Sequence, residues 1–417
     1  MKAVVLVGGR GSRLADVSGG RPKALVPVSG VPVLARTLKM LRREGIRDVI
    51  LVCGHLSEQI RAFCGDGSAF GVQIEYYIES DPLGTGGALF RLGLRDDFFL
   101  LGGDLVFDVD LRAMRDFHTK KNALATLFAH PSAHPSDSTL LCADADDRVT
   151  AFLPAERRDI DVHNLANAGI AILSPALLAR CAVSGCADLD RDVLRPNVSS
   201  GRIFAYRSFE YVKDMGTPAR LAEVERDLAR DLPRKRQKSR PHPAVFLDRD
   251  GTLNVHKGYI SRPEDLELLP GVAEAVRRIN QSGLLAVLVT NQPVVARGAC
   301  TIAQLERIHC RLEALLGEGG AFLDAIYYCP HHPDKGFAGE NPLYKTDCAC
   351  RKPKPGMLLR AAAELDIDLP QAYMVGDTMT DVQTAWNAGC RPVLLAEKPD
   401  APDVLTFPDL LSFVQAL

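Results

Sequence analysis

The chain has 417 residues, of which 47% are hydrophobic and 24% charged, and its formal net charge is −2. This size and composition are typical of a globular chain that is too long for one ordinary core, so we expect two domains. The near-neutral charge gives no electrostatic case for a nucleic-acid partner, and no apolar run reaches the roughly 20 residues that would span a membrane.

The eleven cysteines do not suggest a disulfide scaffold in a chain of this length. Most stand alone and are expected to be reduced core thiols, namely Cys53, Cys64, Cys142, Cys181, Cys186, Cys300, Cys310 and Cys390. Residues 1–9 have the pattern of a strand that enters a glycine loop, not that of a signal peptide. We therefore expect a cytoplasmic enzyme.

A strand at residues 1–7 runs into a glycine loop that carries Arg13, and Lys23 follows a short distance later. Glycines after a strand allow backbone N–H groups to approach phosphates, and the two basic side chains add positive charge. The lysine spacing does not fit the Gly-Lys-Ser/Thr phosphate loop, and the third glycine of a dinucleotide loop is missing.

The combined pattern, GGxGxRL followed by PKxLxPVxGxPxL, resembles that of the sugar-1-phosphate nucleotidyltransferases. The resemblance implies a Rossmann-like domain that joins a nucleoside triphosphate to a sugar 1-phosphate and releases pyrophosphate. It implies catalytic roles for Arg13 and Lys23. It also implies a nucleotide-binding set of Gly8, Gly9, Gly11, Ser12, Arg13, Lys23, Glu79, Gly84 and Thr85.

Expected strands at residues 48–53, 73–77 and 98–101 alternate with helical patterns at 33–44 and 57–64. This order predicts an α/β fold with a parallel sheet. The third of these strands ends just before Asp104, and such a sheet keeps its site at the carboxyl ends of its strands.

The family resemblance implies that Asp104 and Asp214 bind Mg²⁺ and that Asn167 and Gly169 contact the sugar. Asp214 also fits the N-terminal turn of a helix, although both carboxylates occur in the family's context. Glu79 could accept the paired N–H donors of guanine, and it also fits an ordinary exposed glutamate. The Leu-Gly-Thr-Gly-Gly sequence that ends at residue 87 resembles the guanylyl- and mannose-type members, so GTP is the expected nucleotide.

One segment departs from the family pattern. Many relatives carry a Glu-Lys-Pro sequence near residues 149–155, where the lysine meets the sugar phosphate. Here residues 151–158 read Ala-Phe-Leu-Pro-Ala-Glu-Arg-Arg. Arg157 and Arg158 are candidates for that contact, and the sequence favours neither.

Between the two halves, residues 234–243 have no apolar periodicity. A charged helical pattern at 219–232 is followed by a basic, proline-flanked run that ends at residue 243. Basic runs can bind nucleic acid, but between two α/β patterns a solvated linker is favoured. The predicted organisation is a first domain at 1–232, a linker at 233–243 and a second domain at 244–417.

The second half contains four polar segments in order, three of them at the ends of expected strands. They are Asp248 with Asp250, Thr290-Asn291-Gln292, Arg351-Lys352, and Asp377 in a segment that ends at Asp381. Together they resemble the haloacid dehalogenase superfamily of phosphohydrolases.

This second resemblance implies a two-step mechanism. Asp248 would attack phosphorus, and Asp250 would protonate the leaving oxygen and then activate water. Mg²⁺ would be held by Asp248, Asp250 and Asp377, while Thr290 and Lys352 would steady the phosphoryl group.

Cys329, His331, Cys348 and Cys350 flank a loop rich in proline and glycine at 333–347. Three thiolates and an imidazole fit a closed tetrahedral Zn²⁺ site that would staple the loop. Two unrelated cysteine clusters are the alternative, and His332 is a rival ligand.

Together with the DRDGTLN and TNQ sequences, the zinc loop makes the second half resemble the histidinol-phosphatase-like branch of the superfamily. Within that branch it resembles most closely the heptose 1,7-bisphosphate phosphatases. Pro293 departs from the serine that is common after TNQ. The implied substrate contacts are His256, Lys257, Gly258, Tyr259, Asn291, Gln292 and Arg351.

The predicted fold class is α/β, with two Rossmann-like domains, the second carrying the zinc-stapled loop. A phosphatase that removes the C7 phosphate of a heptose bisphosphate leaves a heptose 1-phosphate, which a sugar-1-phosphate nucleotidyltransferase consumes. The fusion thus predicts consecutive steps toward a nucleotide-activated heptose, with a first half resembling heptose 1-phosphate guanylyltransferases. The alternatives are a transferase for a mannose- or glucose-type 1-phosphate with a histidinol-phosphatase-like partner, and a binding protein with one inactive domain. The intact aspartates count against the latter.

Overall fold

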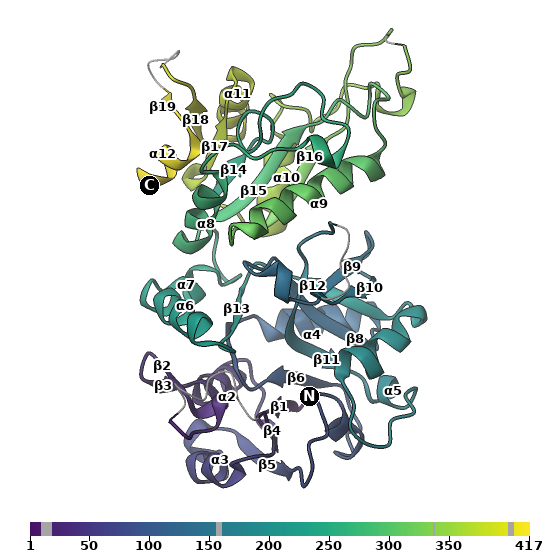
Figure 1. Cartoon of the computed structure of the whole chain (residues 1–417), viewed down its shortest axis with the longest axis vertical. Coiled ribbons are helices and arrows are strands. Elements are labelled where there is room, and N and C mark those ends of the chain that lie inside the picture. The colour runs from purple at the N-terminus through teal and green to yellow at the C-terminus, as the bar shows by residue number, and fades with distance from the viewer. Residues whose placement is uncertain (10–18, 156–160, 337, 399–403) are drawn as a thin grey trace. The chain divides into compact units, whose positions relative to one another are not determined.

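The structure is a computed structural model that describes residues 1–9, 19–155, 161–336, 338–398 and 404–417 (Figure 1). The chain divides into two compact units. Unit 1 comprises Met1–His130, Leu141–Leu153 and Leu165–Gln237, and unit 2 comprises Pro131–Leu140, Pro154–Asn164 and Lys238–Leu417. Near the middle of the chain the division falls between Gln237 and Lys238, and the domain boundaries at 232 and 244 stay a prediction.

Unit 1 is built on a nine-stranded sheet in which β10-β9-β11-β6-β1-β4-β5 are neighbours, with β8 joining β11 and β12. The strands are β1 (Ala3–Leu6), β4 (Asp48–Cys53), β5 (Gln73–Ile78), β6 (Phe98–Gly102), β8 (Ala125–His130), β9 (Leu140–Ala143), β10 (Val149–Leu153), β11 (Ala166–Leu173) and β12 (Ile203–Arg207). Strands β1, β4, β5 and β6 are parallel, as predicted. Strand β11 is antiparallel to β6 and β8, so the sheet is mixed, which the sequence did not indicate.

The helices of unit 1 follow the hydrophobic periodicity of the sequence. The longer ones are α2 (Val33–Arg43), α3 (Ser57–Cys64), α4 (Leu111–Lys121) and α6 (Pro218–Ala229). Helix α2, for example, buries Leu34, Leu38 and Leu41, which recur on one face at helical spacing. These leucines join strand residues such as Val5 and Leu51 in one apolar core.

A separate two-stranded ribbon pairs β7 (Leu105–Asp108) with β13 (Tyr211–Asp214) in antiparallel register. Asp214 lies opposite Leu105, and the Met215 N–H donates to the Asp104 carbonyl at 3.1 Å. The ribbon therefore brings together two carboxylates that lie far apart in the sequence.

Unit 2 contains a six-stranded sheet in the order β16-β15-β14-β17-β18-β19, and every neighbouring pair is parallel. Its strands are β14 (Ala244–Leu247), β15 (Leu285–Asn291), β16 (Ala325–Cys329), β17 (Tyr373–Gly376), β18 (Arg391–Leu395) and β19 (Leu405–Phe407). This is the Rossmann strand order, in which a site forms outside the carboxyl end of the first strand. That strand is β14, which ends directly before Asp248.

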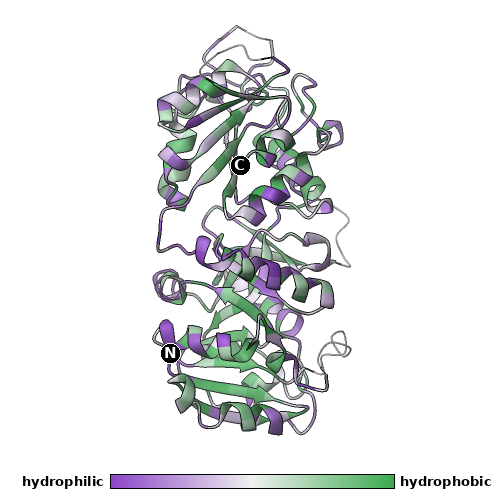
Figure 2. Ribbon diagram, turned by 90° about the vertical axis from the view of Figure 1, so that its left-hand side faces the viewer, coloured by the Kyte–Doolittle hydropathy of each residue, from purple (hydrophilic) through white to green (hydrophobic). Residues whose placement is uncertain are grey.

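Helices α8 (Val272–Ser282), α9 (Ile302–Glu318), α10 (Gly356–Leu365), α11 (Met379–Ala388) and α12 (Leu410–Gln415) accompany this sheet. Residues of α8, α9 and α12 pack with Val245 and Leu247 in one core. Figure 2 shows the strands of both sheets as predominantly hydrophobic and much of the helical surface as hydrophilic. The predicted α/β class with two Rossmann-like domains is confirmed.

The segment 233–243 is more ordered than a solvated linker would be. Its first residues complete α7 (Leu232–Lys235), and Arg236 and His242 are buried. The Arg236 Nε donates to the Phe209 carbonyl at 2.7 Å.

Among the described residues, no helix is both long enough and apolar enough to cross a membrane.

Candidate active sites

In unit 1, the ends of β1, β4 and β5 meet around Gly8. A Cβ added at Gly8 would lie 3.1 Å from the Gly54 nitrogen and 3.2 Å from the Glu79 Oε2. Glycine at this position therefore leaves room for a ligand or for the neighbouring backbone. Gly9 follows in the same loop, and a Cβ added there would meet no described residue within 4 Å. Gly11, Ser12 and Arg13 lie outside the described residues, as do Arg157 and Arg158.

Glu79 lies at the end of β5, where its N–H donates to the Cys53 carbonyl at 2.8 Å. Its Oε1 is buried and has no hydrogen-bond partner within the described residues. Burial raises the pKa of this carboxyl, against smaller opposing effects from the Leu83 N–H and Arg91. An unpartnered buried acceptor beside a glycine loop has the chemistry to accept N–H donors from a ligand.

The glycine-rich loop around Gly84 packs closely against the segment 185–189. A Cβ at Gly84, whose φ is +74°, would lie 2.4 Å from the Ala187 carbonyl oxygen. The Thr85 hydroxyl accepts from the Leu189 N–H at 2.8 Å and donates to Asp188 at 3.3 Å. In the structure, these two predicted nucleotide contacts are thus engaged with the chain itself.

Asp104 and Asp214 each face a cation of the chain. Lys23 Nζ donates to Asp104, and Arg220 Nη1 donates to the Asp214 Oδ2 at 2.6 Å. The Asp214 Oδ1 accepts from the Gly216 N–H at 2.8 Å. Burial opposes ionisation of Asp214, but Arg220 and this N–H outweigh it and lower the pKa of the carboxyl. The arrangement brings two carboxylates and Lys23 to one place.

Asn167 and Gly169 lie at an irregularity in the pairing of β11 with β8. The Asn167 amide donates to the Asp190 Oδ1 at 3.4 Å and accepts from the Gly169 N–H at 3.4 Å. Burial raises the pKa of Asp190 to about 6. The sequence prediction did not include Asp190, because its neighbour Asn167 is 23 residues away.

In unit 2, three carboxylates meet at the ends of β14 and β17. Oxygens of Asp248, Asp377 and Asp381 lie within 4.8 Å of one another. Lys352, which is almost fully buried, places its Nζ 2.8 Å from the Asp248 Oδ1 and 2.6 Å from the Asp381 Oδ1. Burial raises the pKa of Asp377 to about 6, with further increases from Asp248 and Asp381. Oxygen donors at this density suit a hard divalent cation.

The Asp250 carboxylate is held by donors on both oxygens. Arg249 Nη2 lies 2.9 Å from Oδ2 and 3.1 Å from Oδ1, Gln292 Nε2 donates to Oδ2 at 2.9 Å, and Asn254 Nδ2 donates to Oδ1 at 3.0 Å. Burial opposes ionisation, but the Arg249 charge and the amide donors lower the pKa of Asp250. The three-carboxylate group contains Asp381, whereas the sequence-based magnesium set contains Asp250.

The Thr-Asn-Gln segment at the end of β15 forms hydrogen bonds with both Asp250 and Lys352. Gln292 Nε2 also donates to the Thr290 hydroxyl at 3.0 Å. The Asn291 amide both donates to the Lys352 carbonyl and accepts from the Lys352 N–H, each at 3.0 Å. Both amides, predicted to contact substrate, are bonded within the protein and fix Asp250 and Lys352.

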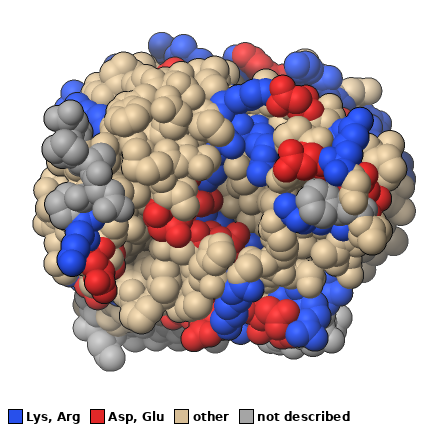
Figure 3. Space-filling view, turned by 90° about the horizontal axis from the view of Figure 1, so that it is seen from above, with Lys and Arg blue, Asp and Glu red and all other residues tan. Residues whose placement is uncertain are grey.

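The remaining predicted substrate contacts lie nearer the surface. Lys257 pairs with Glu267 at 2.7 Å, and Tyr259 is 54% exposed with the Arg297 guanidinium 4.8 Å from its ring centre. His256 and Gly258 are also exposed. Arg351 Nη1 donates to the His331 carbonyl at 3.1 Å. Figure 3, which views the molecule from above, shows acidic side chains gathered in a hollow with basic ones farther out.

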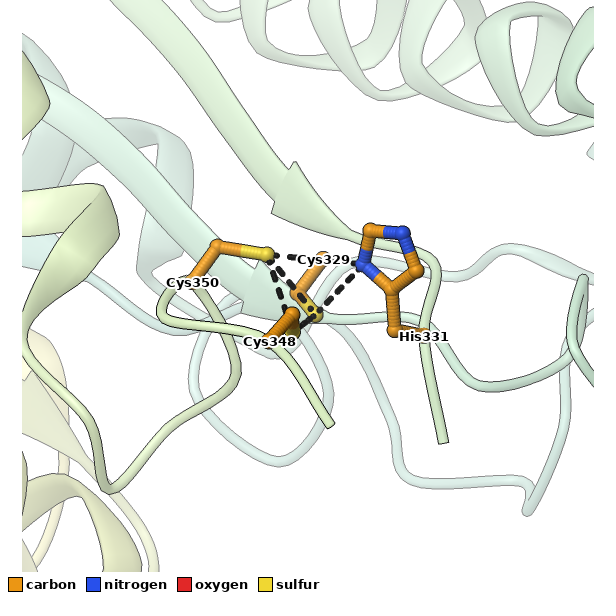
Figure 4. A group of neighbouring side chains, drawn as sticks. All are labelled: Cys329, His331, Cys348 and Cys350. Carbon is orange, nitrogen blue, oxygen red and sulfur yellow. Dashed lines mark hydrogen bonds between the residues drawn. The ribbon is translucent and has the colours of Figure 1, made fainter. Parts of the chain in front are cut away.

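Cys329, His331, Cys348 and Cys350 converge as predicted (Figure 4). The Cys350 sulfur lies 3.2 Å from those of Cys329 and Cys348, and the His331 Nδ1 lies 3.5 Å from the Cys350 sulfur. Four ligand atoms in so compact a group can hold one tetrahedral metal ion. His332 is not in the group, and its Nδ1 instead accepts from the Asp334 N–H.

Comparison with known proteins assigns both halves. The nucleotidyl transferase family model matches residues 2–231, more than half of the chain, and the HAD-hydrolase-like model matches 349–407. The chain is therefore a bifunctional enzyme, with a nucleotidyl transferase domain followed by a phosphatase domain.

Two curated relatives match the second half. The D-glycero-D-manno-heptose-1,7-bisphosphate 7-phosphatase of Thermosynechococcus vestitus is 48% identical over 158 residues, which are 37% of this chain and 79% of that protein. The D-glycero-beta-D-manno-heptose-1,7-bisphosphate 7-phosphatase of Escherichia coli K12 is 43% identical over 163 residues, 39% of this chain and 83% of that protein. The chain belongs to the nucleotidyl transferase family and, in its second half, to the family of these phosphatases.

Among solved structures, HddC from Yersinia pseudotuberculosis is 23% identical, covers 54% of this chain and 99% of its own, and gives a TM-score of 0.46. A likeness of this size is not evidence of a shared activity.

Proposed function

We propose that the chain catalyses two consecutive steps in the synthesis of a nucleotide-activated heptose. The second domain removes the C7 phosphate of D-glycero-D-manno-heptose 1,7-bisphosphate, and the first couples the resulting heptose 1-phosphate to a nucleoside triphosphate. The product with GTP is GDP-D-glycero-α-D-manno-heptose. One observation carries the proposal: a relative of 7-phosphatases is fused to a nucleotidyl transferase, and the product of the former is the kind of substrate that the latter uses.

The residues of unit 2 fit a magnesium ion, because Asp248, Asp377 and Asp381 offer closely spaced carboxylate oxygens. The sequence-based set of Asp248, Asp250 and Asp377 shares two of these residues. When bound, the ion would offset the negative charge of the phosphate and of the carboxylates.

The chemistry at phosphorus follows from the chain's own groups. The Asp248 carboxylate forms a bond to phosphorus as the bond from phosphorus to O7 breaks, and the Asp250 carboxyl group, protonated when this step begins, gives its proton to O7 and becomes a carboxylate. Asp250 then takes a proton from water, whose oxygen attacks phosphorus and releases Asp248 and inorganic phosphate. Lys352 holds Asp248 from the side, and Thr290 steadies the phosphoryl oxygens.

In the first domain, the heptose phosphate oxygen attacks the α-phosphorus of the triphosphate, and pyrophosphate leaves. Asp104 and Asp214 would hold a second magnesium ion, since the β7–β13 ribbon brings them together. Lys23, beside Asp104, would neutralise charge on the triphosphate. Asn167, whose amide donates to Asp190, would accept hydrogen bonds from sugar hydroxyls.

Glu79 supports GTP as the nucleotide. Guanine presents two adjacent N–H donors, and a carboxylate can accept both. The Glu79 Oε1 is buried without a partner in the described part of the chain, and its other oxygen lies close to the Gly8–Gly54 pair. A uracil or thymine ring offers one N–H donor and leaves the second carboxylate oxygen unpaired.

The test supplies heptose 1,7-bisphosphate with each of GTP, ATP, CTP, UTP and dTTP and follows phosphate, pyrophosphate and nucleotide-sugar. We expect phosphate with every triphosphate and nucleotide-sugar with GTP. Mannose 1-phosphate and histidinol phosphate serve as comparison substrates for the two domains. Phosphate release without nucleotide-sugar from any triphosphate would overturn the two-step proposal, and a preference for UTP or dTTP would overturn the role of Glu79.

The four-residue metal site of unit 2 is proposed to hold structural Zn²⁺. Three thiolates and one imidazole are typical zinc donors, and the free state of all eleven cysteines fits the cytoplasm. Cys350 precedes Arg351 and Lys352 directly, so the zinc would fix the loop that carries the catalytic lysine.

Replacing Cys348 with Ser is therefore expected to remove the zinc and reduce phosphatase activity at least about tenfold, because Lys352 loses its anchored loop. Nucleotidyl transfer is expected to remain. Metal analysis and both assays on one preparation check this, with exposed Cys186→Ser as the matched control. Full phosphatase activity in a zinc-free variant would contradict the role of the ion.

A further inference from the structure

We propose that Arg249 is a positioning residue of the phosphatase: it holds the Asp250 carboxylate where a proton can reach the leaving oxygen. This inference rests on the proposed phosphatase function, and neither family membership nor the predicted motif roles assign it. The expected effect of losing Arg249 differs between substrates. Loss of Arg249 should slow the hydrolysis of phosphate esters whose leaving group needs a proton.

Arg249 stands between the two catalytic aspartates in the sequence, and its side chain is fully buried. It reaches Asp250 through two nitrogens, Nη2 at 2.9 and 3.1 Å and Nε at 3.3 Å. The planar guanidinium therefore restricts rotation of the carboxylate, which a single point contact would not do.

The burial of Arg249 has a cost in free energy. A charged side chain with no exposed surface is costly, and an apolar residue of similar size commonly packs there at lower free energy. The Arg249 Nη1 is buried and has no hydrogen-bond partner among the described residues. His309, also fully buried, is neutral and adds no charge beside Arg249, since burial and the Arg249 charge lower the pKa of its ring to about 3. Asp250 is the one carboxylate in the described chain with which Arg249 forms an ion pair.

The other donors to Asp250 are neutral amides. Asn254 and Gln292 each contact a different oxygen, and they come from separate segments of the chain. Without Arg249 they would leave the carboxylate with one donor per oxygen and no charge to hold it. Proton transfer requires hydrogen-bond distance to the leaving oxygen, so a protonated Asp250 side chain that can rotate away is a poorer acid.

The test compares two esters in Arg249→Met and Arg249→Lys. Heptose 1,7-bisphosphate has a sugar alcohol as leaving group, whereas p-nitrophenolate leaves without a proton. We expect kcat for the heptose to fall about 100-fold, the size of a general-acid contribution. The release of p-nitrophenolate in the first turnover precedes hydrolysis of the aspartyl-phosphate, and its rate should change less than about threefold. The KM for heptose 1,7-bisphosphate should not change. Lysine keeps the positive charge but lacks the planar guanidinium with its several donors, so the Arg249→Lys variant should also lose more activity on the heptose ester than on p-nitrophenyl phosphate.

Arg278→Met, which removes an exposed arginine of α8, is the matched control and should leave both rates unchanged. Thermal unfolding checks the fold of each variant, and if the methionine variant does not fold, the lysine variant decides. Equal losses on both esters, or no loss on heptose, would overturn the inference. If the unaltered enzyme does not hydrolyse heptose 1,7-bisphosphate, the proposed function fails. The selectivity, which is the loss of rate on an alkyl phosphate divided by the loss on p-nitrophenyl phosphate, is then measured with the alkyl phosphate that the enzyme does hydrolyse.

Discussion

Replacing Asp248 with Asn is expected to abolish phosphate release and to leave nucleotidyl transfer unchanged. In the proposed mechanism the carboxylate is the attacking group, and an amide of the same shape is not a nucleophile, so a loss of at least about 10⁴-fold is expected. Asp248 lies at the end of β14, 2.8 Å from Lys352. The measurement is inorganic phosphate from heptose 1,7-bisphosphate, with nucleotide-sugar formation from heptose 1-phosphate assayed in the same preparation.

Asp265→Asn is the control for this variant, because Asp265 is a surface residue of unit 2 paired with Arg262. It should retain both activities. If Asp248→Asn lost nucleotidyl transfer while remaining folded, the two sites would not be independent. If it kept phosphate release, another residue would have to be the nucleophile.

Replacing Asp104 with Asn is expected to have the opposite effect. Asp104 pairs with Lys23 and, across the β7–β13 ribbon, lies near Asp214. Loss of its charge would weaken the proposed metal site and leave Lys23 without its partner, so we expect pyrophosphate release to fall about 10²- to 10³-fold. Phosphate release by the second domain should stay within the error of the assay.

Asp116, an exposed residue on α4, supplies the control substitution Asp116→Asn for unit 1. Pyrophosphate release at the normal rate in Asp104→Asn would exclude the carboxylate from the reaction. A matching loss of phosphatase activity would instead indicate that the variant had disturbed the whole chain.

Much of the phosphatase site follows from the sequence, because its residues stand at strand ends. Asp248 and Asp377 directly follow two parallel strands and Thr290 lies near the end of a third, and the carboxyl ends of parallel strands share one edge of the sheet. The cysteine group was also predictable, since metal ligands occur in close pairs along the chain. The parallel part of the first sheet was predicted from the alternation of expected strands and helices, and the bifunctional class from the two family resemblances; both are confirmed.

The remaining features depend on which atoms face each other, which a sequence pattern does not encode. Arg249 could have pointed to solvent, and its grip on Asp250 is visible only in the folded chain. The amides of Asn291 and Gln292 have the chemistry of substrate ligands, but the structure uses them to brace Lys352 and Asp250. Asp190 and the antiparallel β11 depend on pairing between distant segments, for which local periodicity carries no signal.

The β7–β13 ribbon bears on how the chain is synthesised. Asp104 leaves the ribosome long before Asp214, and at about 5–20 residues per second the delay between them is several seconds. Until β13 emerges and pairs with β7, the first domain has one of its two carboxylates in place. A nascent chain can thus form most of the first sheet before its transferase site is complete.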